Sequence, residues 1–216
     1  METVVRKDII EWGVAGQPLL GQTESGDCYV VKQCAEGVLI AVIDGVGHGP
    51  EAAAAARLTV QVLEEYACSD PLIALLEECH VRLRGARGAV ISLAMLDATR
   101  DTITWLGIGN IEGLLLRNLP RDSSTNTKQQ EILLLRAGVV GHQLPRMALD
   151  TLPMHPGDIV IFATDGIRPD FADNIGTGGS PSMIANEILE HHALETDDAL
   201  VLVVRYLHEQ DTYSRA

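Results

Sequence analysis

The sequence predicts an α+β fold in which residues 1–216 form a single domain, without an appended sensory or regulatory domain. Two helical patterns follow one another between residues 50 and 84, and short apolar runs broken by turns extend from residue 88 to residue 117. Paired helices together with strands in hairpins are typical of the α+β class. The hydrophobic fraction of 46%, with only 4% aromatic residues, predicts a sizeable core of aliphatic side chains.

The first quarter of the sequence predicts three strands and the start of a helix. Residues 4–16 mix β-branched residues with charges, which is typical of an edge strand, and residues 17–27 read as a loop. Residues 28–33 and 37–44 are apolar runs separated by a short connection, so we expect them to pair. Pro50 stands at the first helical position, and the alanine run after it would let the helix lie close to a sheet.

A second helix is expected directly after the first. Ser69 or Asp70 would be its N-cap, Pro71 its first residue, and Gly85 would end it. Its apolar residues recur at helical spacing, and they are Leu72, Leu75, Leu76, Cys79 and Leu83. Cys79 is therefore expected to be a small buried hydrophobic residue and not a nucleophile.

The second half of the sequence predicts further hairpins and a last helix. The expected segments, in chain order, are hairpins at 88–117, a flexible loop at 118–130, a strand at 131–138, a strand that ends at Asp165, a mobile loop at 174–182, a helix that ends at His192 and a strand at 199–207. Ser180 and Pro181 are the expected N-cap and first residue of that helix.

Charge and composition exclude several classes of function. The formal net charge of −14 would repel a polyanion, so nucleic acid is excluded as a partner. No apolar run is long enough to span a bilayer, and membrane insertion is therefore not expected. The four cysteines form no CxxC pair, and no secretory segment precedes the first strand, so we expect reduced thiols in a cytoplasmic protein.

The segment that follows the apolar run GVLIAVI is the first candidate site. Asp44 ends this strand, glycines follow at positions 45, 47 and 49, and a helix begins at Pro50. This arrangement can hold a cation or a phosphate, although Asp-Gly is also a common turn dipeptide. The construction recurs at Asp165-Gly166, and Asp197-Asp198 precedes the last apolar run. If the three strands are neighbours, these carboxylates converge.

Five motifs together resemble one protein family. They are ESGD at 24–27, DGVGHG at 44–49, GIGN at 107–110, TDGI at 164–167 and DDALVLVV at 197–204. Their order and content resemble the PPM family of metal-dependent serine/threonine protein phosphatases, in the bacterial branch that includes SpoIIE, RsbU and RsbX. The short N-terminal part makes the chain most like the stand-alone RsbX type. This resemblance implies a four-layer sandwich of two antiparallel β-sheets flanked by helices.

The resemblance also implies a metal site and a role for each acidic residue. Two divalent cations, Mn²⁺ or Mg²⁺, would be held by hard oxygen ligands. Asp44 would bridge the two ions, the Gly45 carbonyl would bind one, and Asp165 with Asp197 would bind the other. Asp27 would orient a water molecule or complete the ligand shell, or else only shape a turn. Asp198 is the alternative to Asp197 as ligand, and one of the two would only cap the turn before the strand.

The sequence departs from the family pattern at three places. Val46 stands where eukaryotic members have a histidine, and His48 could donate a proton or merely pack at the helix start. No arginine lies beside the first motif to bind the phosphate, which leaves Arg168 as a candidate. Asn110 resembles a residue that shapes the floor of the site, but an ordinary hairpin turn is the favoured interpretation.

These features predict a phosphatase acting on phosphoserine or phosphothreonine. By resemblance, its substrates would be phosphorylated STAS-domain proteins of a stressosome, and it would reset a bacterial stress-signalling pathway. Two alternatives remain open at this point. The missing arginine and the histidine displaced to position 48 would suit a catalytically weak pseudo-phosphatase that binds phosphoproteins. A closed pocket would suit a phosphatase of free phosphoserine or another small phosphomonoester.

Overall fold

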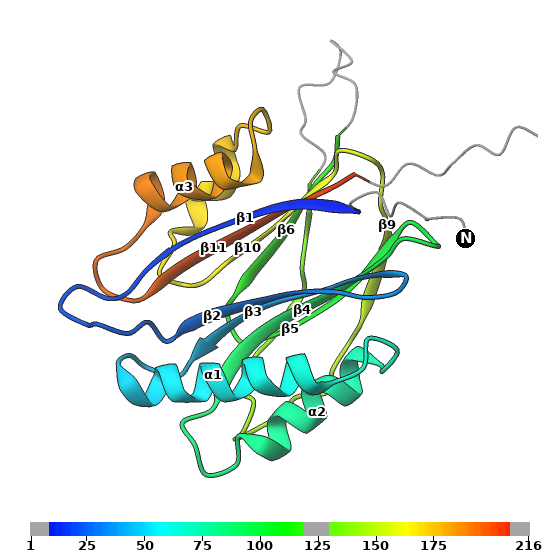
Figure 1. Ribbon diagram of the computed structural model, residues 1–216. Helices are drawn as coiled ribbons and strands as arrows, with labels where there is room; N and C mark the ends of the chain where they lie inside the picture. The colour runs from blue at the N-terminus through cyan, green and yellow to red at the C-terminus, as the bar shows by residue number, and fades with distance from the viewer. Residues whose placement is uncertain (1–8, 119–129, 208–216) are drawn as a thin grey trace, which may run out of the picture.

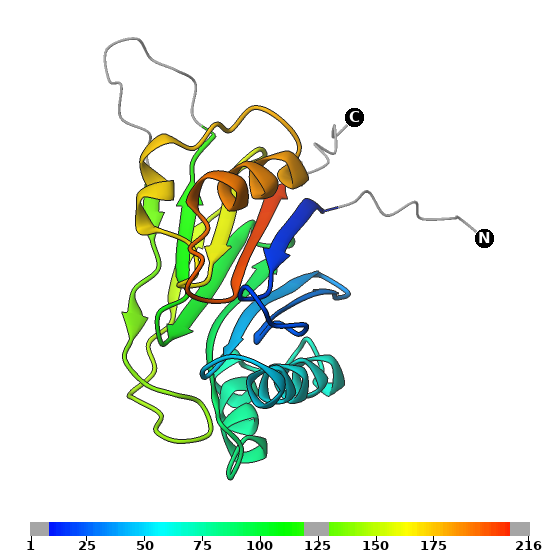
Figure 2. The same cartoon turned by 90° about the vertical axis from the view of Figure 1, so that its left-hand side faces the viewer.

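The computed structural model describes residues 9–118 and 130–207, which form two β-sheets packed face to face between helices. In Figures 1 and 2, α3 covers the outer face of one sheet, and α1 and α2 cover the outer face of the other. The expected four-layer α+β architecture is therefore confirmed. One detail differs from a purely antiparallel fold, because the short pairing between β5 and β8 is parallel.

The first sheet has five strands and one covering helix. Its strands, in spatial order, are β1 (Ile10–Gln17), β11 (Ala199–Tyr206), β10 (Ile159–Ala163), β6 (Glu112–Leu116) and β7 (Gln130–Ile132). Helix α3 (Pro181–His192) packs on it through Ile184, Ala185 and Ile188, next to the 3-10 helix η1 (Pro169–Asn174). Ser180 is the N-cap of α3, as expected, because its hydroxyl accepts a hydrogen bond from the Met183 N–H.

The second sheet has six strands and two covering helices. Its strands are β2 (Asp27–Gln33), β3 (Gly37–Gly45), β4 (Ala89–Asp97), β5 (Thr102–Ile108) and β8 (Leu135–Arg136), with β9 (Asp150–Pro153) also paired to β5. The covering helices are α1 (Pro50–Glu65) and α2 (Leu72–Arg82). Within the described ranges, no helix is both long and apolar enough to cross a membrane.

Strand β3 shows why the central strands are continuously apolar. Ile40 and Val42 point into the core between the sheets, whereas Leu39, Ala41 and Ile43 point toward the side covered by α1 and α2. Both faces of the strand are thus buried, and an unbroken apolar run is the sequence signature of such a strand. The same double burial places Asp44 at the end of a rigid element.

Four expectations need correction because they depended on long-range pairing or on cap geometry. Residues 88–117 do not form one sheet, since β4 and β5 belong to the second sheet and β6 to the first. Residues 131–138 are likewise divided between β7 and β8, in different sheets, and β9 was not expected. Helix α2 has Pro71 as its N-cap, without a capping side chain, because the extended backbone of Pro71 delays the helix by one residue. Parts of two expected segments, 4–8 and 119–129, lie outside the described residues.

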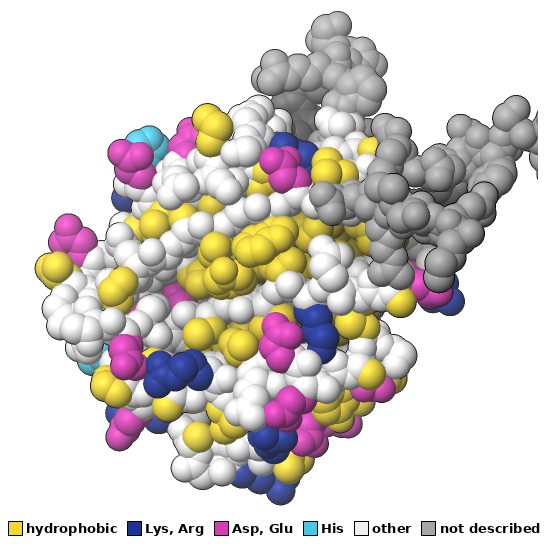
Figure 3. Space-filling view, viewed as in Figure 1, with side chains coloured by type: hydrophobic (Ala, Val, Ile, Leu, Met, Phe, Trp, Pro, Cys, Tyr) yellow, Lys and Arg dark blue, Asp and Glu magenta, His cyan; other side chains and the backbone are white. Residues whose placement is uncertain are grey.

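Edge strands β1 and β2 lie on the same side of the sandwich. Figure 3 shows a band of apolar side chains at the surface between these two strands, where the two sheets meet. Trp12 on β1 and Tyr29 on β2 contribute to it, with ring centroids 5.8 Å apart. This aromatic pair links the two sheets at their edge.

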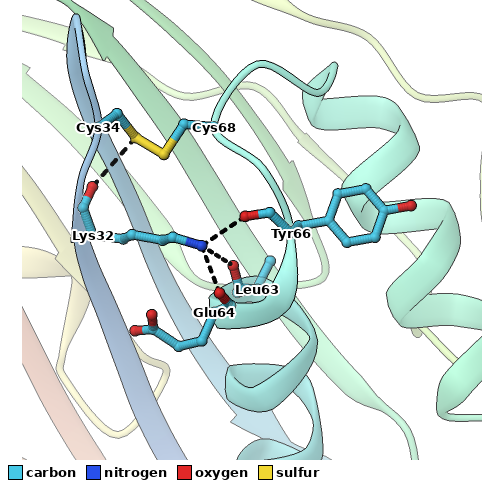
Figure 4. The surroundings of a disulfide bond; sticks show 6 residues. All are labelled: Lys32, Cys34, Leu63, Glu64, Tyr66 and Cys68. Carbon is cyan, nitrogen blue, oxygen red and sulfur yellow. Dashed lines mark hydrogen bonds between the residues drawn. A yellow bond between two sulfur atoms is a disulfide. The ribbon is translucent and has the colours of Figure 1, made fainter.

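The expectation of reduced thiols is wrong for two of the four cysteines. Cys34, after β2, and Cys68, after α1, form a disulfide with a Cα–Cα distance of 5.8 Å. Beside it, the Lys32 ammonium donates to the carbonyls of Leu63, Glu64 and Tyr66 at 3.3, 2.6 and 2.6 Å (Figure 4). The two free cysteines are Cys28 and Cys79, and Cys79 is buried under α2 as predicted.

Candidate active site

Two carboxylates face each other where the β2–β3 hairpin opens. Asp27 is the first residue of β2, and the strand register places it opposite Asp44 near the end of β3. The Gly45 N–H donates to the Gly26 carbonyl at 3.0 Å, which holds the two backbones together at this point. The sequence motifs at 24–27 and 44–49 therefore meet in space.

Two more carboxylates come from the other sheet. Strands β10 and β11 are neighbours, so that Asp165, just after β10, and Asp197, just before β11, reach the same end of the sheet. The Thr164 hydroxyl donates to Oδ2 of Asp27 at 2.8 Å and joins the two sheets. The expected neighbouring of the three strands is wrong, because β3 lies in the other sheet from β10 and β11. Asp44 is nevertheless near enough to Asp165 and Asp197, across the interface between the sheets, for their charges to act on it.

The close approach of these carboxylates disfavours their ionised forms. Burial, and then the charges of Asp27, Asp165, Asp197 and Asp198, raise the pKa of Asp44 to about 9. Burial also raises the pKa of Asp27 to about 7, although the Thr164 hydrogen bond opposes this shift. The pKa of Asp165 is raised by burial and by Asp197. A cation at this point would remove the repulsion and favour all of the charged forms.

The donor atoms fit a divalent cation. Oδ1 of Asp27 is buried and has no hydrogen-bond partner among the described residues, and the site offers carboxylate and carbonyl oxygens of the kind that Mg²⁺ and Mn²⁺ prefer. In their present rotamers, no three His, Cys, Asp or Glu side chains within residues 9–118 and 130–207 are grouped so that they could hold a metal ion.

Asp198 has a different environment from Asp197. Its side chain is buried, and its two oxygens accept hydrogen bonds from the Leu19 N–H at 2.7 Å and the Gly26 N–H at 2.8 Å. Both oxygens therefore anchor the loop that precedes β2. The Asp197 carboxylate accepts one bond, from the Asp198 N–H at 2.9 Å, and its other oxygen remains available.

Asn110 contacts the site, which corrects its favoured interpretation as a hairpin turn. The connection that contains it joins β5 to β6, in different sheets, and its Nδ2 donates to Oδ2 of Asp165 at 2.6 Å. Arg168, in contrast, is held by Asp170 at 3.3 Å and by the His191 carbonyl at 2.7 Å. His48 is exposed at the start of α1, and no hydrogen bond of its side chain occurs within the described part of the chain.

Two neighbouring residues were missed by sequence reasoning. Thr164 lies within the TDGI motif, and its position next to Asp165 was the available signal. Arg87 lies forty residues from the DGVGHG motif and carries no local signal at all. Gly47 has a φ of 86°, which favours glycine, and a Cβ there would lie 2.7 Å from Nη1 of Arg87, so the guanidinium lies close against this loop.

Comparisons with known proteins agree with this geometry. The sequence model of the Stage II sporulation protein E (SpoIIE) family matches residues 35–210. The phosphoserine phosphatase RsbX of Bacillus subtilis (strain 168) is 24% identical over 179 residues, which cover 82% of this chain and 85% of RsbX.

Solved structures show the same fold. A structure of RsbX in complex with magnesium has a TM-score of 0.79 and 22% identity, and the match covers 95% of this chain and 100% of that one. A structure from the bacterial stressosome, described as a modular system adapted to control secondary messenger signalling, has a TM-score of 0.80 and 27% identity, over 92% and 100% of the two chains. With a family match that spans residues 35–210 and the same fold as the RsbX structure, the chain belongs to the SpoIIE family of PPM-type serine/threonine phosphatases.

Proposed function

We propose that this chain is a Mn²⁺- or Mg²⁺-dependent phosphatase that removes phosphate from phosphoserine or phosphothreonine of STAS-domain stressosome proteins. In this role it would reset a bacterial stress-signalling pathway in the cytoplasm. The observation that carries the catalytic part is the meeting of Asp27 and Asp44 with Asp165 and Asp197 at one end of the two sheets. The likeness to RsbX and to the stressosome structure supports the choice of partner.

Each residue of the site has a role in this proposal. Asp44 and the Gly45 carbonyl hold cations from the second sheet, and Asp165 with Asp197 hold them from the first. Asn110 orients Asp165 through its 2.6 Å hydrogen bond. When bound, the divalent ions neutralise phosphoryl charge and activate water at neutral pH. Asp27 is fixed by Thr164, and its unpartnered Oδ1 would accept a hydrogen bond from a water molecule or complete the ligand set.

The exposure of the site favours a protein substrate over a metabolite. Asp165 and Asn110 are exposed, and the loop at Val46–His48 that follows Asp44 is exposed as well. A phosphorylated side chain on the surface of another protein can reach such a site without entering an enclosed cavity.

Phosphate release from a phosphorylated STAS-domain protein tests this function. We expect release with Mn²⁺ or Mg²⁺, loss with a chelator, and loss in Asp44→Ala. Asp70→Ala is the matched control, because it removes a carboxylate at the opposite end of α1. Activity that survives both chelation and Asp44→Ala would contradict the metal-dependent mechanism. A much higher kcat/KM for free phosphoserine than for the phosphoprotein would indicate a metabolite phosphatase.

A phosphoprotein-binding module without turnover is the second candidate. Val46 in place of a histidine and the engagement of Arg168 with Asp170 favour it. Four converging carboxylates speak against it, because a site without metal would gain stability by losing them. Calorimetry distinguishes the two, since a binding module of this kind would not take up Mn²⁺.

A further inference from the structure

Two segments beside the site carry arginine and no acidic residue. They are residues 83–88, with Arg84 and Arg87, and residues 136–146, with Arg136 and Arg146, and together we call them the basic rim. The whole chain has 30 Asp and Glu but only 16 Lys and Arg. Four arginines without one carboxylate in these two segments therefore depart strongly from the composition of the rest.

The two segments pack against each other and form one surface. The Ala89 N–H donates to the Val140 carbonyl at 3.0 Å, and the Val140 N–H returns a bond to Ala89 at 2.8 Å. His142 Nε2 lies 2.9 Å from the Arg87 carbonyl. Figure 2, which looks onto the end where β3 and β10 finish, shows the 136–146 segment beside the turn at 83–88.

The basic rim is bonded to both loops of the site. At one end, the Gly109 N–H donates to the Arg136 carbonyl at 2.9 Å, next to Asn110, which holds Asp165. At the other end, the Val46 N–H donates to the Gly88 carbonyl at 3.1 Å, two residues beyond Asp44. The two segments of the rim are thus adjacent to the two loops that contain Asp44 and Asn110.

Three of the four arginines of the rim differ from the other arginines in their partners. Arg84, Arg136 and Arg146 are exposed, and within residues 9–118 and 130–207 none of them forms an ion pair or a side-chain hydrogen bond. Every other described arginine is paired with a carboxylate; these are Arg57, Arg82, Arg87, Arg100, Arg117, Arg168 and Arg205. The three arginines without such a partner all belong to the two segments that pack against each other.

We propose that the basic rim binds acidic residues that flank the phosphorylated residue of the protein substrate. The proposal rests on the phosphatase function above and adds a sequence preference to it. A net charge of −14 repels an acidic phosphoprotein over most of the surface, so a local surface with unpaired guanidinium groups decides where it can approach. Arginine also forms bidentate hydrogen bonds with carboxylates.

Two phosphoserine peptides that differ only in their flanks test the preference. One has Asp and Glu on both sides of the phosphoserine, and the other has Ala and Ser. We expect about tenfold higher kcat/KM for the acidic peptide at low salt, mostly through KM, and a loss of this preference as ionic strength rises. A chromogenic aryl phosphate, which has no flanks, serves as the reference for the chemical step.

Charge variants locate the effect on the rim. Arg84→Gln, Arg136→Gln and Arg146→Gln should each lower the preference about two- to fourfold, and the triple variant should abolish it. Arg100→Gln is the matched control, because it removes the same charge from an exposed arginine in the β4–β5 turn. Hydrolysis of the aryl phosphate should stay unchanged in all of them. The triple Arg→Glu variant should prefer basic flanks.

Each possible outcome decides between the two proposals. If wild-type protein hydrolyses neither peptide nor aryl phosphate, the phosphatase function fails, and fluorescence anisotropy with labelled peptides still tests the rim. Equal rates for both peptides, or equal effects of rim and control variants, would overturn the rim proposal alone. Slower aryl phosphate hydrolysis in the rim variants would overturn it too, because docking leaves that reaction untouched. Displacement of the bound peptide by a single-stranded oligonucleotide would also overturn the rim proposal.

Discussion

The two ends of helix α1 differ in what holds them. At its start, Gly49 is the N-cap without a side-chain hydrogen bond, and the preceding strand delivers Asp44 into a group of mutually repelling carboxylates. At its end, Lys32 donates to three carbonyls, and the Cys34–Cys68 disulfide ties the following connection to the β2–β3 turn (Figure 4). One end is thus electrostatically unfavourable, and the other is cross-linked.

The start of α1 therefore lies at the candidate active site, whereas the end of α1 contributes to the stability of the fold. The disulfide closes a loop that contains β3, the segment from Asp44 to Gly49 and the whole of α1. The closed loop can therefore retain its shape although its site end is destabilised by like charges. We expect variants at the two ends to have opposite effects on stability and activity.

Asp44→Asn should give the largest change. Removing the central carboxylate should lower phosphatase activity on the order of 10³-fold, because the cations lose their shared ligand. The same change should raise the thermal midpoint of the metal-free protein at neutral pH, since Asp44 must take up a proton on folding and the neutral amide need not. Calorimetry and phosphate release measure the two effects. A metal-free midpoint that falls in Asp44→Asn would contradict the electrostatic account of this end.

Replacing both Cys34 and Cys68 by serine should have the next largest effect. Loss of a cross-link with a sequence separation of 34 residues should lower the free energy of unfolding by about 3 to 4 kcal/mol. Urea denaturation measures it, and Cys28→Ser is the control because that thiol is free. The turnover number should change little. A large loss of activity with unchanged stability would show that the two ends are coupled.

Lys32→Met should destabilise the cross-linked end by about 1 to 2 kcal/mol, because three carbonyls at the end of α1 lose a charged donor. The effect should be non-additive with Cys34→Ser, since both changes release the same end of the helix. A double-mutant cycle by urea denaturation measures the coupling. Additive effects would mean that the ammonium and the disulfide act independently.

Asn110→Ala should lower the turnover number by about tenfold while leaving stability nearly unchanged, because its amide positions Asp165 and is exposed. Asn118→Ala is a suitable control, since that amide donates to the Pro156 carbonyl and not to the site. Steady-state kinetics and thermal unfolding measure the two properties. If the Asn110→Ala variant has unchanged kinetics, the side chain of Asn110 does not contribute to catalysis.

The pH dependence of the metal-free protein tests the electrostatic account of the site end without any substitution. The pKa of Asp44 is about 9 in the folded protein and about 3.9 when unfolded, so the folded state binds the proton more tightly. Stability from this group is complete below about pH 4 and is lost as the pH rises toward 9. Thermal midpoints should fall steadily between pH 5 and 9 without metal, and Asp44→Asn should flatten the trend. A midpoint that rises over this range would contradict the shift.

Local patterns were sufficient where a structure depends on neighbouring residues. The double burial of β3, the start of α3 at Ser180 and the position of Asp44 and Asp165 after apolar strands all follow from short-range signals. Motif order added the family and the fold. The prediction of the α2 N-cap was wrong, because Ser69, Asp70 and Pro71 are three equally suitable residues for the start of a helix.

By itself, then, the sequence determined the types of the main elements, the acidic motifs and the family to which they belong. Only the tertiary structure decided which sheet takes β6 and β8, that Asn110 and Thr164 bond to site carboxylates, that Cys34 meets Cys68, and that three unpaired arginines share one rim. The physical reason is distance along the chain. Paired strands, disulfide partners and neighbouring charged groups can be tens of residues apart in the sequence. Hydrophobic periodicity and turn motifs report only on nearby residues, so they do not predict such contacts.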